Sequence, residues 1–148
     1  MVKYQKGDIT KIEADVIVNA ADTRLHHGGG VALAIARAAG PALEEESKAA
    51  AYCPLGEFAV TTAGNLKARE VVHIPTIDYT RGAVKISYKD LALAWSRVLK
   101  HCSESGYKTI ATPILGGGVV GLDKEKVREI LAAEAERHNE ITVIIVEF

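Results

Sequence analysis

The 148-residue chain has the length of one domain with a substantial hydrophobic core, and we treat residues 1–148 as a single domain. Its 18 basic and 19 acidic side chains give a net charge of −1, so no overall positive field exists to attract nucleic acid. No apolar stretch approaches the roughly 18 residues of a membrane helix, and the two distant cysteines match no metal or redox motif. We therefore expect a cytoplasmic protein that contacts neither membrane nor nucleic acid.

Short β-branched runs alternate along the chain with longer segments of helical periodicity. In chain order, the pattern predicts a strand at 14–20, helices at 30–40 and 41–52, strands at 57–64 and 69–76, a helix at 84–106, a strand at 108–114, a helix at 122–138 and a strand at 141–148. The longest helix places Leu91, Trp95, Val98 and Leu99 on one face. This alternation predicts an α/β fold with a largely parallel sheet that is covered by helices on both faces.

Glycine triplets occupy two of the strand-to-helix connections, at Gly28–Gly30 and at Gly116–Gly118. Ligands of such sheets bind beyond the carboxyl ends of the strands, where these connections meet. A helix start offers unpaired N–H groups and a positive dipole end, and glycine lets an anion approach them closely. One such loop favours a phosphate site, and two in one sheet favour a diphosphate held between them; tight turns are the structural alternative.

Two better-known phosphate motifs fit this pattern poorly. A P-loop requires Lys-Ser or Lys-Thr after its glycines, and neither triplet supplies that pair. Gly116, Gly118 and Gly121 match a dinucleotide fingerprint in spacing, with Glu147 at the end of the next strand. That fingerprint requires further strands downstream and leaves the first triplet unexplained.

Taken together, the segments "KGDITKIEADVIVNAAD", "RLHHGGGVALAIARAAG" and "TPILGGGVVGLD" resemble the macro domain, an ADP-ribose-binding module. The resemblance extends over almost the whole chain. It implies a three-layer α/β/α sandwich with a mixed, mainly parallel sheet of about six strands. It also implies that ADP-ribose, free or attached to a protein, is the ligand and partner, and that no cofactor or metal is needed.

The resemblance assigns a binding role to residues in both signatures. Asp8, with Ile9 beside it, would accept a hydrogen bond from the adenine amino group, although Asp8 could equally cap a turn. Asn19 would contact the terminal ribose, and Phe148 would pack on adenine or simply anchor the last strand. The remaining predicted contacts are Gly28, Gly29, Gly30 and Val31 around the terminal ribose and one phosphate, and Gly116, Gly117, Gly118, Val119 and Val120 around the other phosphate and ribose.

The sequence leaves open whether the chain only binds ADP-ribose or also hydrolyses a bond to it. Hydrolytic macro domains, which this chain resembles, carry "NAAN" and "VDGAIH" at the positions where this chain has "NAAD" and "VALAIA". Ala32 and Ala36 therefore stand where those domains have polar residues. Candidate substitutes are Asp22, His26 and His27, whose carboxylate or imidazole would act as acid or base, and Asn19 is the fourth candidate catalytic residue. The hydrolytic alternative covers removal of ADP-ribose from modified proteins and of phosphate from ADP-ribose 1″-phosphate.

Overall fold

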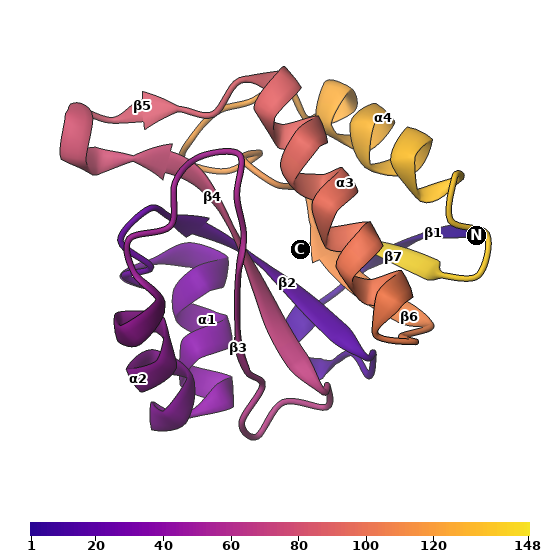
Figure 1. The fold of residues 1–148 in the computed structure, drawn as a ribbon, viewed down its shortest axis with the longest axis horizontal. Helices are drawn as coiled ribbons and strands as arrows, with labels where there is room; N and C mark the ends of the chain where they lie inside the picture. Colours follow the sequence, from indigo (N-terminus) through magenta and orange to yellow (C-terminus); the bar gives the residue numbers. More distant parts are fainter.

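A seven-stranded sheet forms the middle layer of the structure, a computed structural model that describes residues 1–148 (Figure 1). In chain order the elements are β1 (Val2–Lys6), the 3-10 helix η1 (Ile9–Lys11), β2 (Val16–Asp22), α1 (Gly30–Ala39), α2 (Pro41–Ala50), β3 (Ala59–Thr62), β4 (Glu70–Asp78), the 3-10 helix η2 (Tyr79–Arg81), β5 (Val84–Lys85), α3 (Tyr88–Glu104), β6 (Thr109–Pro113), α4 (Lys124–Ala135) and β7 (Thr142–Glu147). None of the helices combines the length and the apolar character that crossing a membrane requires.

The sheet has the strand order β1-β7-β6-β2-β4-β3, with β5 paired to the far end of β4. The five strands from β1 to β4 in this order pair in parallel, whereas β3 and β5 each run antiparallel to β4. The predicted α/β class and the mixed, mainly parallel sheet are therefore confirmed. Because the parallel strands share one direction, the connections that follow β1, β2, β6 and β7 gather at one edge.

The core is divided between the two faces of this sheet, and helices cover both faces (Figure 1). Strand residues alternate between them: Val16 and Val18 of β2 pack toward α3 and α4, while Ile17 packs toward α1 and α2. Trp95 of α3 is fully buried, and its indole N–H donates to the Leu131 carbonyl of α4 at 3.0 Å. The three-layer α/β/α arrangement follows from this two-sided burial.

The predicted helix at 84–106 begins later in the structure, at Tyr88. The Ser87 hydroxyl accepts the N–H of Asp90 at 3.0 Å and so caps the helix, while Val84 and Lys85 extend along β4. The apolar periodicity extends upstream of Ser87. The Ser87 side chain nevertheless caps the helix at this point, so the residues before it are not helical.

Strand β1 was absent from the predicted elements because its side chains carry little burial signal. Four of its five residues are exposed, and it forms an outer edge of the sheet, held by parallel pairing of Val2 with Val143 and onward along β7. The main-chain hydrogen bonds of an edge strand require no particular side chain. The residues of β1 therefore show no sustained alternation of apolar and polar side chains from which a strand could be predicted.

Candidate functional site

A cavity of about 630 Å³ opens at the edge of the sheet where the parallel strands end. It is lined by residues that follow β1, begin α1, follow β6 and end β7, namely Gly7, Asp8, Ile9, Gly30, Val31, Ala34, Pro113, Ile114, Gly117, Gly118, Lys124, Val146, Glu147 and Phe148. Both glycine triplets therefore contribute to one cavity. Its volume lies in the range of about 300–1,000 Å³ that is typical of small-molecule sites.

The first triplet presents free main-chain donors at the start of α1. The Gly28 N–H donates to the His26 carbonyl at 2.9 Å, but the N–H groups of Gly29, Gly30 and Val31 meet no acceptor within the chain. Gly29 caps the helix without any side-chain hydrogen bond, and Gly30 has φ +56°, a conformation that favours glycine. The positive end of the ten-residue helix therefore carries unsatisfied donors beside the cavity.

The second triplet divides between a structural glycine and an open one. Gly116 is buried with φ +72°, and a Cβ placed there would lie 2.5 Å from Leu122 Cδ1, so only glycine fits. Gly118 has no atom within 4 Å of an added Cβ, and its N–H and those of Val119 and Val120 have no acceptor within the chain. The requirement of a tight turn therefore explains Gly116, whereas Gly118 leaves open space in the cavity wall.

Asp8, which also lines the cavity, caps η1 and keeps one oxygen free. Asp8 Oδ1 accepts the Thr10 hydroxyl at 2.6 Å and the Thr10 N–H at 2.9 Å, and these hydrogen bonds hold the pKa of Asp8 below its usual range. Its Oδ2 accepts no hydrogen bond from the chain. Ile9 is buried in the cavity wall, and Phe148 lines the cavity with 96% of its surface exposed.

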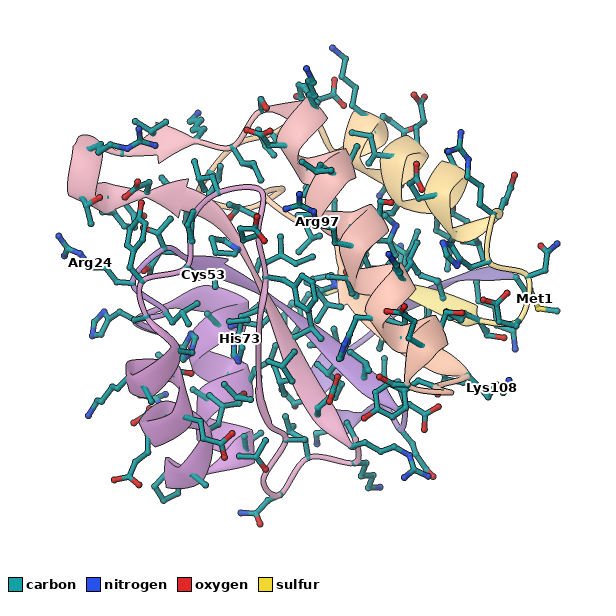
Figure 2. All side chains as sticks on the ribbon, viewed as in Figure 1. Met1, Arg24, Cys53, His73, Arg97 and Lys108 are labelled. Atoms are coloured by element: carbon teal, nitrogen blue, oxygen red, sulfur yellow. The ribbon has the colours of Figure 1, made fainter.

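Asn19 lies outside the cavity lining, within a buried polar network in the interior, where His73 is also found (Figure 2). Its Nδ2 is 3.0 Å from His73 Nδ1 and 3.3 Å from His27 Nδ1, and its Oδ1 is buried with no partner. The far ring nitrogen of His27 bonds to Ser47, and that of His73 bonds to Thr61, each at 2.9 Å. The alternation of β2 directs Asn19 to the same face as Ile17, toward α1 and α2.

Both histidines of this network are neutral at neutral pH, since burial disfavours the charged ring. Burial lowers the pKa of His73 to about 3 and also lowers that of His27. The two rings stack with their centroids 5.0 Å apart. Because both ring nitrogens of His27 are already occupied by Asn19 and Ser47, neither is available to act on a ligand.

Asp22 and His26 belong to the loop between β2 and α1. Asp22 is half-buried, and its Oδ1 accepts the Arg24 N–H at 2.7 Å, so it stabilises the turn while its second oxygen stays free. His26 is exposed, and Arg24 points away from the molecule (Figure 2). Of the four predicted catalytic residues, only Asp22 therefore combines partial burial with a free carboxylate oxygen.

The predicted contacts thus fall into two groups. Those that line the cavity are Asp8, Ile9, Gly30, Val31, Gly117, Gly118 and Phe148. Those that lie outside its lining are Asn19, Gly28, Gly29, Gly116, Val119 and Val120, together with Asp22, His26 and His27. In this second group, Val119 stands 97% exposed at the loop tip and the Val120 side chain is buried.

Three charged residues outside the set of predicted contacts also bear on the site. Lys124 and Glu147 line the cavity from the start of α4 and the end of β7. Asp78 is fully buried at the end of β4, where it accepts hydrogen bonds from Thr23 of the first glycine connection and from Tyr52. Hydrogen bonds, the first of them from the Thr80 side chain, hold the pKa of Asp78 well below its usual range. The position of Lys124 just after the second glycine loop was the signal available in the sequence.

Comparison with known proteins agrees with this architecture. A sequence model of the Macro domain matches residues 18–131. A Mycobacterium bovis protein is 38% identical over 140 residues, which cover 93% of this chain and 37% of that protein, so the chain spans little more than a third of this relative. A Klebsiella pneumoniae protein named O-acetyl-ADP-ribose deacetylase is 41% identical over 128 residues, or 84% of this chain and 73% of that protein.

Among solved structures, the Trypanosoma brucei macrodomain in complex with ADP-ribose superposes with a TM-score of 0.85 and 29% identity, covering 98% of this chain and 63% of that one. The family match extends over most of the chain, and the superposition includes nearly all of it. This chain belongs to the Macro domain family.

Proposed function

We propose that this chain binds ADP-ribose, free or attached to a protein, with the diphosphate held between its two glycine loops. The observation that carries the proposal is the convergence of Gly30 and Gly118 on one cavity, each with a free N–H group. Main-chain donors and the positive end of α1 stabilise an anion without any side chain. The ADP-ribose complex of the Trypanosoma brucei macrodomain supports the same ligand.

The adenosine half of the ligand is assigned to the opposite end of the cavity. Asp8 keeps an unpaired carboxylate oxygen there, which is the acceptor that an adenine amino group requires. Ile9 and Phe148 supply apolar surface beside it. An amino group and a flat ring would thus both find complementary partners at this end.

Calorimetry tests this assignment of the two cavity ends. Wild-type protein is expected to bind one ADP-ribose and to bind AMP less tightly, because AMP occupies the adenosine end and only part of the diphosphate site. Asp8→Asn is expected to weaken ADP-ribose binding about tenfold, since its side-chain oxygen can still cap η1 while a free acceptor is lost. Glu129→Gln, the same chemical change on an exposed residue of α4, is the control. Equal affinity for AMP and ADP-ribose would contradict the two-loop arrangement.

A second candidate function is hydrolysis of an ester bond to ADP-ribose. The name of the Klebsiella relative and the free oxygen of Asp22 both support it. That carboxylate would orient the attacking water. Asp22→Asn, which retains an acceptor for the Arg24 N–H, is expected to lower turnover of O-acetyl-ADP-ribose about 100-fold with ADP-ribose affinity unchanged. His26→Gln serves as the control. Equal turnover in wild type and Asp22→Asn would exclude Asp22 as the hydrolytic residue.

A further inference from the structure

Lys124 is the only cationic side chain that lines the cavity. The other charged residues of the lining are Asp8 and Glu147, both acidic, so the side chains alone give the cavity a net negative charge. Two carboxylates in the same cavity would repel a diphosphate unless a cation offset their negative charge. The ammonium of Lys124 is therefore the one side-chain charge of the right sign for the proposed ligand.

The stem of Lys124 passes directly over the second glycine loop. Lys124 is the first residue of α4, and its Cγ lies 3.2 Å from the position of a Cβ built on Gly117. Gly117 is thus packed between Lys124 and the Ile114 carbonyl, which lies 3.1 Å from the same position. This packing holds the base of the lysine side chain at the loop while its long stem leaves the ammonium free to move.

The contact of Lys124 with Glu147 is loose enough to be exchanged. Lys124 Nζ is 3.8 Å from Glu147 Oε2, which is too long for a hydrogen bond, and its side chain is 54% exposed. Glu147 already has a closer partner, because an Arg128 Nη donates to its Oε1 at 2.8 Å. If Lys124 moved away, Glu147 would still be paired, and all three ammonium donors would be available to a ligand.

We propose that Lys124 is a specificity-determining residue that turns from Glu147 onto the diphosphate held at the second glycine loop, and so favours a diphosphate over a single phosphate. The inference rests on the proposed binding of ADP-ribose and adds to the main-chain donors one side-chain charge. Arg128 remains on Glu147 and prevents that carboxylate from opposing the bound anion. The ligand class selected in this way is a nucleoside diphosphate.

Calorimetry at about 0.05 M and about 0.5 M salt tests the proposal with the 148-residue chain and ADP-ribose or AMP. At low salt, Lys124→Met is expected to bind ADP-ribose about tenfold more weakly than wild type, and this loss is expected to shrink at high salt. The same variant is expected to lose less affinity for AMP, while Lys124→Arg retains most of the wild-type affinity for ADP-ribose. Lys126→Met removes a charge from the same helix outside the cavity and is expected to match wild type.

Two results would overturn the role of Lys124 while leaving ADP-ribose binding in place. One is that Lys124→Met binds ADP-ribose as tightly as Lys126→Met does. The other is an equal loss for AMP and ADP-ribose at both salt concentrations, which would assign Lys124 to packing of the loop. If wild-type protein shows no binding of ADP-ribose at all, the proposed function itself fails, and the inference about Lys124 fails with it. Melting temperatures of the variants verify that α4 remains folded.

Discussion

Replacing Gly118 with valine is expected to weaken ADP-ribose binding at least about 100-fold, a loss of about 2.7 kcal/mol, while leaving the protein folded. Gly118 lines the cavity, and no atom lies within 4 Å of a Cβ built on it. Its φ lies outside the left-handed region, so a side chain causes no backbone strain. The added side chain would fill space that the proposed ligand requires.

The neighbouring Gly116 shows why the position of the substitution matters. Gly116 has φ +72°, and a Cβ there would overlap Leu122, so a side chain at Gly116 would disturb the loop in the absence of any ligand. Only Gly118 separates the effect on binding from the effect on folding. This contrast is not visible in the sequence, where the three glycines of the triplet look alike.

Calorimetry with ADP-ribose, together with a thermal melt, measures both parts of this expectation. Ala133→Val adds two methyl groups to an exposed position of α4 and provides the control for an added β-branched side chain. Its affinity for ADP-ribose is expected to equal that of wild type. A Gly118→Val protein that binds ADP-ribose normally would show that the ligand does not approach the second glycine loop.

Acidification from about pH 7.5 to about pH 4.5 is expected to destabilise the protein by about 2.5 kcal/mol through His73 alone. Burial lowers the pKa of His73 from 6.5 in the unfolded chain to about 3 in the folded protein. Above pH 6.5 the ring is neutral in both states and adds no pH dependence. As the pH falls from 6.5 toward 3, the unfolded chain binds a proton that the folded protein excludes, so stability is lost.

His27 acts in the same direction, because burial lowers its pKa as well. Carboxylates whose folded-state pKa is lowered, such as Asp8 and Asp15, contribute stability above about pH 4 and lose it only at more acidic pH. In the window from about pH 7.5 to about pH 4.5 the buried histidines therefore dominate the change in stability. Protonation of either ring would also break its hydrogen bond with the Asn19 amide, since both would then be donors.

Urea unfolding of wild type and His73→Gln at the two pH values measures the effect of His73. The variant removes the titrating ring, so it is expected to lose less stability on acidification than wild type, by about 2.5 kcal/mol. His26→Gln, the same substitution at an exposed histidine, is the matched control. If the stabilities of wild type and His73→Gln fell in parallel, His73 would have to titrate alike in the folded and unfolded states.

Periodicity and loop chemistry alone determined the fold class and the approximate position of most elements. Alternating apolar runs are a local property, and so is the occurrence of glycine before a helix. The prediction that both triplets meet at one edge followed from parallel strand direction, and Gly30 and Gly118 do line the same cavity. Asp8 likewise could be assigned both as a turn cap and as a ligand contact, and the structure shows the cap and leaves one oxygen free.

Tertiary structure decided which side chains line the cavity, because burial and pairing depend on residues far apart in the chain. The sequence pattern placed Asn19 near the end of a strand, as expected of a ligand contact, yet Asn19 lies within β2, and its contacts with His27 and His73 place it in the interior. Lys124 looks like an ordinary surface residue of a helix until packing on Gly117 places it beside the cavity. The sequence alone thus predicted the edge of the sheet at which the cavity lies, and long-range packing determined the charges and donors that line it.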